Sequence, residues 1–376
     1  MKISKIQLVC FRNYANTSIM FHDGMNIFLG DNAQGKTNIL ESITILALTK
    51  SHRIGVSPNI IMFQKKKCKI SGVVKKDKII SKLEVEIGED YKKLKINHKD
   101  IKKVSDYISY LNVIVFTPDD LEIIKGSPNI RRNLLNIQLS QLSKTYLNSY
   151  NEYNKLLKVR NEYLKVLFQN SIADKTYLDI ITDRLIEKAI IIYQKRKEYI
   201  DLINLNINNN YKNISEDSGL FIEYVPNISI QDFEYETIRK SLKHTFKKYY
   251  MKELNYGMTV YGPHRDDIIF QLKDKDLKFY GSQGQQRLAV ISFKLSEIPI
   301  FKDICNTEPV LLLDDIFSEL DVKKRNKLLK IIHSSGVQSI ITTTDLKSIQ
   351  KKYVDDAFLF HVKNGVIERE SRDKNE

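Results

Sequence analysis

Short apolar runs alternate along the chain with stretches in which apolar residues recur every three or four positions. The segments Met25–Leu29, Pro309–Leu313 and Gln338–Ile341 are short and mostly apolar, which is typical of strands inside a parallel sheet. From Lys36 to about Leu48 the spacing becomes that of a helix, with apolar positions at Ile39, Leu40, Ile43, Ile45 and Leu46. The pattern therefore predicts an α/β fold.

The middle of the chain predicts a pair of helices. Ser127 is a favourable N-cap and Pro128 a favourable first helical residue. An apolar stripe follows, interrupted by Arg160, and consists of Leu135, Leu139, Leu142, Tyr146, Tyr150, Tyr153 and Leu157. A polar break at Gln169–Lys175 precedes a second stripe of Leu178, Ile181, Leu185 and Ile192. We expect a short antiparallel helical arm, whose stripes form either local core or a lever.

Beyond the arm the pattern changes three times. Asn208–Asn213 is polar and is expected to be a loop, Leu220–Val225 a strand, and Tyr235–Leu254 a basic helix. The lysines of this helix are Lys240, Lys243, Lys247, Lys248 and Lys252. From Gln283 to about Glu297 a second amphipathic helix carries Leu288, Ile291, Leu295 and Ile298 on one side.

The loop between the first predicted strand and helix matches the phosphate-binding pattern G-x-x-x-x-G-K-[ST]. Its residues are Gly30, Asp31, Asn32, Ala33, Gln34, Gly35, Lys36 and Thr37. Glycines let backbone N–H groups turn toward phosphate oxygens, and the helix N-terminus attracts the same charge. Lys36 is expected to reach the β- and γ-phosphates, and Thr37 to bind Mg²⁺. The loop therefore predicts binding of ATP with Mg²⁺.

Two carboxylates follow the apolar run that starts at Pro309, which is a Walker B pattern. Ligands of open α/β sheets lie beyond the carboxyl ends of the strands, so Asp314 is expected to hold Mg²⁺ through its water shell. Asp315 would face the γ-phosphate and orient or deprotonate the attacking water. Paired acids after a strand can also simply cap a helix, and the phosphate-binding loop favours the nucleotide site.

The segment Gly281–Arg287 resembles the signature motif of ABC-type ATPases. Its residues Ser282, Gly284 and Gln285 fall at a predicted helix N-terminus, where free N–H groups can bind phosphate. In ABC-type ATPases this site completes the nucleotide pocket of a partner subunit. Taken alone the motif is equally a plain helix start, but its place before Asp314 and the D-loop-like Ser318–Asp321 favours the signature.

The charge of the chain indicates an anionic partner. Of its 376 residues, 60 are Lys or Arg and 46 are Asp or Glu, which gives a net charge of +14. The cluster Lys65–Lys69 and the basic helix after Tyr235 are candidates for sequence-independent contact with DNA phosphates. The alternative is that these lysines only solvate exposed faces.

The sequence gives no sign of disulfides, a metal site or a membrane segment. Three cysteines, at positions 10, 68 and 305, are too few for a disulfide framework, and the seven histidines form no metal-ligand pair. No apolar run approaches a membrane span and no signal peptide begins the chain. We expect a cytoplasmic protein.

Several further motifs resemble those of RecF proteins, the bacterial replication and repair ATPases related to SMC and Rad50 heads. They extend over nearly the whole chain, and Tyr261–Asp267 is the most specific of them. The others are Phe11–Tyr14, Ser51–Arg53, Phe116–Leu121, Lys125–Pro128 and Arg131–Arg132. The resemblance implies an ABC-type P-loop ATPase head of residues 1–127 and 257–376, with a helical arm domain inserted at 128–256.

The resemblance also implies a function and partners. These are an ATP-dependent homodimer on single- or double-stranded DNA, slow hydrolysis that resets the clamp, and cooperation with the RecO and RecR mediators in loading recombinase at gaps. Support of the SOS response follows from the same resemblance. By the same route Arg53 is expected to touch the base or ribose of ATP, the alternative being a solvated charge.

Some positions depart from the wider ABC pattern. Asp315 stands where transporter-type ATPases have a catalytic Glu, Thr117–Asp120 where a Q-loop glutamine would be sought, and Thr342–Thr344 in place of the histidine switch. His264 and Arg265 either meet DNA or tie the arm to the head. An ABC transporter subunit, whose head lacks such an insertion, and a non-hydrolysing SMC-like scaffold are the alternative functions.

Overall fold

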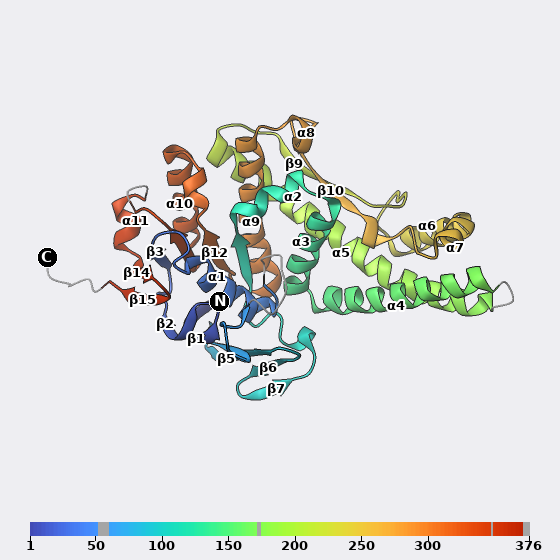
Figure 1. The fold of residues 1–376 in the computed structure, drawn as a ribbon. Coiled ribbons are helices and arrows are strands. Elements are labelled where there is room, and N and C mark those ends of the chain that lie inside the picture. The colour runs from blue at the N-terminus through green and yellow to red at the C-terminus, as the bar shows by residue number, and fades with distance from the viewer. Residues whose placement is uncertain (52–59, 171–173, 347–348, 371–376) are drawn as a thin grey trace. The chain divides into compact units, whose positions relative to one another are not determined.

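The computed structural model describes residues 1–51, 60–170, 174–346 and 349–370 (Figure 1). The chain divides into two compact units: Met1–Asp120, Lys212–Glu216 and Lys294–Glu376 form the first, and Leu121–Tyr211 and Asp217–Phe293 the second. Helices α5 (Lys175–Ser215) and α9 (Gln283–Cys305) have residues in both. This division places the stretch from residue 257 to Phe293 with the insertion, so the expected domain limits stay a prediction.

A mostly parallel sheet forms the centre of the first unit. Its strand order is β15-β14-β3-β13-β12-β8. The strands are β3 (Met25–Leu29), β8 (Val113–Phe116), β12 (Val310–Asp314), β13 (Ser339–Thr343), β14 (Phe358–Lys363) and β15 (Val366–Arg369). Every residue of β12 and β13 is buried, as expected for strands covered on both faces. The three strands predicted from the sequence are confirmed.

An antiparallel sheet in the same unit has the order β2-β1-β4-β5-β6-β7. Its strands are β1 (Lys2–Phe11), β2 (Tyr14–Met20), β4 (Lys67–Lys76), β5 (Ile79–Gly88), β6 (Lys92–Ile96) and β7 (Lys99–Ile101). Helix α1 (Lys36–Leu48) buries Ile39, Leu40 and Ile43 in one core with residues of both sheets. The helix that follows the phosphate-binding loop is therefore anchored on both sides.

Two further helices belong to the first unit. Helix α10 (Val322–Ser335) begins after Asp321, whose side chain accepts a hydrogen bond from the N–H of Lys324, and ends at Gly336 with φ +69°. Helix α11 (Lys351–Asp355) is short and precedes β14.

The second unit is mostly helical. It contains α2 (Glu122–Lys125), α3 (Pro128–Leu142), α4 (Lys144–Gln169), α6 (Tyr235–Lys248), α7 (Tyr250–Tyr256) and α8 (Leu277–Tyr280), besides most of α5. A small antiparallel sheet adds β9 (Leu220–Val225), β10 (Asp267–Leu272) and β11 (Lys275–Asp276) in the order β11-β10-β9. In Figure 1, α4 and α5 run side by side in opposite directions. Glu152 and Lys188, 2.6 Å apart, join them.

Three expectations about these helices need correction. Asn208–Asn213 is the last part of α5 rather than a loop, because Ile203, Ile207, Tyr211 and Ile214 continue its buried stripe. The first stripe is divided by Ser143, which ends α3 and whose side chain caps α4 by accepting from the N–H of Tyr146 (3.1 Å). The basic helix is likewise divided at Tyr249.

Buried ion pairs hold the second unit together. Arg160 is 1% exposed and lies 2.7 Å from Glu253, so the residue that interrupts the first stripe is a core residue. Arg196 is equally buried and donates to Asp266 at 2.9 Å. Arg131 contacts both carboxylate oxygens of Asp267, at 2.6 and 2.8 Å. Such pairs are costly to break, because removing one partner leaves the charge of the other buried and uncompensated.

Candidate nucleotide-binding site

The phosphate-binding loop connects β3 to α1 at the carboxyl end of the parallel sheet. Gly35 has φ +113°, and a Cβ there would lie 2.5 Å from Asn13 Nδ2. A Cβ on Gly30 would lie 2.4 Å from the carbonyl oxygen of Val362. The backbone path therefore requires both glycines of the motif. Gly30 is required by close approach, and Gly35 by close approach and by its conformation.

Neighbouring segments fix this loop from outside. The Tyr14 hydroxyl donates to the Gly35 carbonyl (3.0 Å), and Asn13 Nδ2 donates to the Gln34 carbonyl (3.2 Å). The N–H of Asn364 donates to Gln34 Oε1 (2.7 Å). Burial raises the pKa of Tyr14, which therefore stays a donor. The Phe11–Tyr14 motif thus supports the loop, a role that its sequence did not reveal.

Lys36 lies folded against its own loop. Its Nζ donates to the carbonyl oxygens of Gly30 (2.5 Å) and Asp31 (2.7 Å). Burial lowers the pKa of Lys36, while the charges of Asp315, Asp314 and Asp31 act in the opposite direction. The ammonium group is thus held among the loop carbonyls and close to both acids.

Asp314, at the end of β12, joins the loop to the sheet. The Thr37 hydroxyl donates to Asp314 Oδ1 at 2.9 Å, and the Thr342 hydroxyl donates to the same oxygen at 2.7 Å. Thr342 is brought there by register, because β12 and β13 are parallel and pair Asp314 with Thr342. A hydroxyl and a carboxylate at this spacing are oxygen ligands of the kind that Mg²⁺ prefers.

Asp315 follows in an unusual backbone conformation. Its φ is +45°, in the left-handed region that residues with a Cβ seldom adopt. Its N–H donates to the Thr342 hydroxyl at 3.0 Å, so one threonine holds both acids in place. Strain of this kind gathers at functional sites. The part played by Thr342 was not predicted, and only the pairing of the two strands reveals it.

Glu41 of α1 accepts hydrogen bonds from residues of two motifs noted in the sequence, Phe11–Tyr14 and Ser51–Arg53. The carboxylate is 0% exposed and receives two hydrogen bonds from Arg12, at 3.0 and 2.7 Å. The Ser51 hydroxyl donates to it as well, at 2.6 Å. Arg53, expected at the base or ribose of ATP, lies outside the described residues.

The signature segment lies in the second unit, at the start of α9. Gln285 N–H donates to the Ser282 hydroxyl (3.3 Å), and Ser282 N–H donates to Gln285 Oε1 (2.9 Å). This is a capping box, so the predicted N-cap is confirmed. Gly284 is exposed, and a Cβ there would meet nothing within 4 Å. The segment is therefore preformed and accessible.

The place where a Q-loop was sought is occupied by an ion pair of the first unit. Asp120 accepts hydrogen bonds from the N–H (2.8 Å) and hydroxyl (3.0 Å) of Thr117. Lys294, 3% exposed, donates to the same carboxylate and to the carbonyl oxygen of Val115. Lys294 was not predicted, since an isolated lysine in an amphipathic helix gives no such signal.

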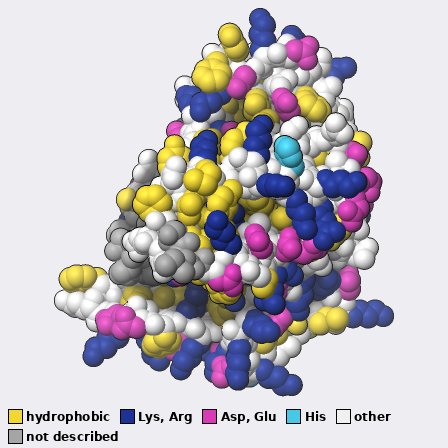
Figure 2. Space-filling model, turned by 90° about the vertical axis from the view of Figure 1, so that its right-hand side faces the viewer, with side chains coloured by type: hydrophobic (Ala, Val, Ile, Leu, Met, Phe, Trp, Pro, Cys, Tyr) yellow, Lys and Arg dark blue, Asp and Glu magenta, His cyan; other side chains and the backbone are white. Residues whose placement is uncertain are grey.

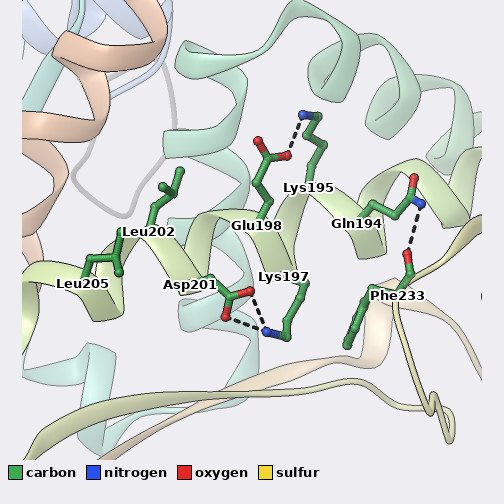
Figure 3. A pocket seen from close by; sticks show the side chains of 8 residues that line it. All are labelled: Gln194, Lys195, Lys197, Glu198, Asp201, Leu202, Leu205 and Phe233. Carbon is green, nitrogen blue, oxygen red and sulfur yellow. Dashed lines mark hydrogen bonds and ion pairs between the residues drawn. The ribbon is translucent and has the colours of Figure 1, made fainter.

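A separate cavity of about 570 Å³ lies along α5 in the second unit (Figure 3). Its charged groups are already paired: Lys197 contacts Asp201 (2.5 Å) and Lys195 contacts Glu198 (2.6 Å). Gln194 donates to the carbonyl oxygen of Phe233 at 3.0 Å. It contains none of the nucleotide motifs.

The described residues contain neither a membrane-spanning helix nor a cluster of metal-ligating side chains. No helix among them has the length and hydropathy to cross a bilayer. Nor do they contain a group of three or more His, Cys, Asp or Glu side chains arranged to hold a metal ion.

Comparison with known sequences decides the family. Residues 2–368 match the family described as RecF/RecN/SMC N terminal domain. The chain is 39% identical over 369 residues to the DNA replication and repair protein RecF of Pediococcus pentosaceus, covering 98% of each. It is 39% identical to the RecF protein of Oceanobacillus iheyensis, covering 98% of this chain and all of that one. The chain belongs to the RecF family.

Solved structures agree with this assignment. A structure described as the recombination mediator protein RecF-ATP in the RecFOR pathway matches with a TM-score of 0.89 at 30% identity, covering 98% of this chain and 97% of that one. An Smc head domain from Pyrococcus furiosus matches with a TM-score of 0.55 at 16% identity, covering 98% and 96%. The second match concerns the fold alone. The RecF fold thus includes the ABC-type head expected from the sequence.

Proposed function

We propose that this RecF-family chain is an ATP-dependent DNA-binding protein of replication and recombinational repair. It acts as a switch: ATP joins two copies on DNA, and slow hydrolysis separates them. The names of its relatives support the repair function, and neither alternative, a transporter subunit or an SMC-like scaffold, has such support.

The observation that carries the proposal is the contact between Thr37 and Asp314 at 2.9 Å, with Lys36 held beside them. The loop N–H groups and Lys36 would bind the phosphates of ATP, and Gly30 to Thr37 would surround them. Thr37 would bind Mg²⁺ directly and Asp314 through its water shell. Mg²⁺ bound there would neutralise charge on the phosphates.

Asp315 is the proposed catalytic acid–base residue. Its carboxylate follows the end of β12 and would orient the attacking water or accept its proton. An Asp is shorter than the Glu of transporter-type ATPases and would hold the water less closely. Slow turnover, suited to a switch, is the expected consequence.

The second half of each ATP site would come from another copy of the chain. Ser282, Gly284 and Gln285 form a preformed helix start that is exposed at Ser282 and Gly284. Exposed N–H groups at the start of a long helix attract phosphate oxygens. ATP held by one loop and contacted by the partner's signature would explain dimerisation that depends on ATP.

The antiparallel sheet of the first unit is the proposed DNA surface. Between Lys65 and Lys103 the sequence contains 14 lysines and six Asp or Glu residues. Only some are paired, for example Lys69 with Glu84 at 2.9 Å. Several exposed lysines have no ion-pair partner among the described residues: Lys65, Lys66, Lys75, Lys78, Lys99, Lys102 and Lys103. Such a surface would bind phosphates regardless of sequence.

The same proposal includes the setting in which the switch works. RecO and RecR would be its mediator partners and the cytoplasm its compartment. A RecF relative described within the RecFOR pathway supports the first of these.

One experiment tests the function as a whole. ATP turnover and particle mass would be measured with and without a duplex oligonucleotide, and particle mass and the affinity for the duplex with and without ATP, all at 50 and 200 mM salt. We expect a dimer with ATP, turnover that rises with DNA, and affinity that falls steeply with salt. DNA that changes neither turnover nor mass and binds without salt dependence would contradict the proposal.

A further inference from the structure

Two tyrosines of the second unit form a stacked pair at its surface. The rings of Tyr249 and Tyr261 have centroids 4.4 Å apart and planes 27° apart. Tyr249 lies between α6 and α7, and Tyr261 precedes β10 in the Tyr261–Asp267 motif. Both side chains are half-buried. The backbone and the neighbouring ring thus hold each ring in one orientation.

Two lysines lie over this pair, Lys248 at the end of α6 and Lys252 on α7. Lys248 Nζ lies 5.3 Å from the centroid of Tyr249, and Lys252 Nζ lies 5.8 Å from Tyr249 and 5.6 Å from Tyr261. With Lys247, also exposed, they have no ion-pair partner among the described residues. Lys243 of the same helix, by contrast, is paired with Asp183 at 3.1 Å.

Figure 2 looks onto the face toward which α6 and α7 extend. Yellow apolar side chains lie there intermingled with dark blue lysines and arginines. This face therefore combines apolar side chains with positive charge.

We propose that Tyr249 and Tyr261, with Lys247, Lys248 and Lys252, form a binding site for single-stranded nucleic acid. An unpaired base stacks on a tyrosine ring and the lysines contact the flanking phosphates. This proposal rests on the DNA-binding function proposed above. In it, this surface binds the single-stranded part of the DNA.

The chemistry of the site favours a single strand over a duplex. Every base has a flat face that can stack on an aromatic ring, but in a duplex those faces are covered by neighbouring base pairs. A lysine that now lies over a ring can move its ammonium group to a phosphate when a base takes its place. Strands of any sequence would bind, with a preference set by stacking strength.

Binding of a fluorescent dT20 strand and of a 20-base-pair duplex to the full-length chain tests the proposal. We expect Tyr249→Ala and Tyr261→Ala each to weaken binding of dT20 by about tenfold or more. Binding of the duplex should change by less than about twofold, while Tyr249→Phe, which keeps the ring, should bind dT20 like the original chain. Replacing Lys247, Lys248 and Lys252 by Ala should reduce the salt slope for dT20 by about two.

Matched controls separate the site from general effects. Tyr256 lies on α7 and is 62% exposed, without a ring contact among the described residues, so Tyr256→Ala should leave dT20 binding unchanged. Lys243→Ala removes a lysine that is already paired and should act weakly. Ultraviolet crosslinking of a strand containing 5-iodouracil, followed by peptide mapping, gives a readout that does not depend on variants. It should identify Tyr249 or Tyr261.

The outcomes are distinct. If the duplex binds with salt dependence but the tyrosine variants bind dT20 normally and crosslinks map elsewhere, this site is wrong and the proposed function stands. If neither DNA binds, both proposals fail. Selective loss of dT20 binding with crosslinks at the pair would support the site.

Discussion

The hydroxyl of Thr37 lies 2.9 Å from Asp314 Oδ1, although 277 residues separate them in sequence. The first residue belongs to the helix that follows the phosphate-binding loop, and the second ends the central strand β12. The parallel strands β3 and β12, with β13 between them, carry both residues to the carboxyl end of the sheet, where ligands of α/β folds bind. The two halves of the nucleotide motif are thus assembled within one unit.

Removing the charged side chain of Lys36 tests the nucleotide-binding site. Lys36→Ala should weaken ATP binding by about ten- to a hundredfold, since a hydrogen bond to a charged group contributes about 1.5–3 kcal/mol. Titration of a fluorescent ATP analogue would measure the loss. Lys99→Ala, which removes an exposed lysine of β7, is the control and should bind as before. Equal affinity of Lys36→Ala and the unchanged chain would contradict the assignment of the loop.

Thr342 should act as a positioning residue for the two acids. Thr342→Val removes the hydroxyl that donates to Asp314 and accepts from the N–H of Asp315. Turnover should fall by about tenfold while the KM for ATP changes little, because the loop that binds the phosphates stays intact. Thr342→Ser should restore turnover. A rise in KM with unchanged kcat would show that Thr342 supports binding instead.

The buried pair of Arg160 and Glu253 should stabilise the second unit. Glu253→Leu leaves the guanidinium buried without its partner, and the free energy of unfolding should fall by about 3–5 kcal/mol. Adding Arg160→Met should recover most of the loss. Urea unfolding followed by circular dichroism measures both. Lys158→Ala, in an exposed pair with Glu162, should change stability by less than about 1 kcal/mol.

His264 should make the second unit sensitive to acid. Burial lowers the pKa of His264 to about 4, and its ring lies between the Tyr153 hydroxyl (2.6 Å) and the Thr259 carbonyl (3.1 Å). The unfolded chain binds this proton near pH 6.5, so the free energy of unfolding should fall from about pH 6.5 to 4, by up to about 1.4 kcal/mol per pH unit.

The histidine contribution can be isolated by substitution. His264→Gln should unfold with a shallower dependence on pH in this window, whereas the exposed His244→Gln should match the unchanged chain. Urea unfolding at pH 4.5, 5.5 and 7 provides the comparison. Parallel curves for His264→Gln and the unchanged chain would contradict the prediction.

Much of the site could be predicted because its signals are local. The residues from Gly30 to Thr37 are consecutive, and Asp314 directly follows an apolar run, so spacing alone identified both. Ser282 was likewise recognisable as an N-cap from its own segment. The strand, helix and cap that these signals predicted are all confirmed.

What the sequence concealed depends on partners distant along the chain. Thr342 becomes part of the site only through the register of β12 and β13. Arg160 interrupts an apolar stripe in the sequence, but in the fold its charge is neutralised by Glu253. The asparagines of 208–213 have low helix propensity. The helix continues nevertheless, because Tyr211 and Ile214 are buried on the same face of α5 as the apolar residues before them. Tertiary packing decided these positions over local preference.

In the proposed dimer, the ATP site at the phosphate-binding loop of one copy is completed by Ser282 of the second copy. The most direct test is the light-scattering mass, in saturating ATP, of Asp315→Asn and of Asp315→Asn combined with Ser282→Arg, with bound nucleotide measured in parallel. We predict twice the chain mass of 43.9 kDa for the first, the single mass for the second, and equal ATP binding by both. A double variant that remains a dimer, or that loses ATP as a monomer, would contradict the claim.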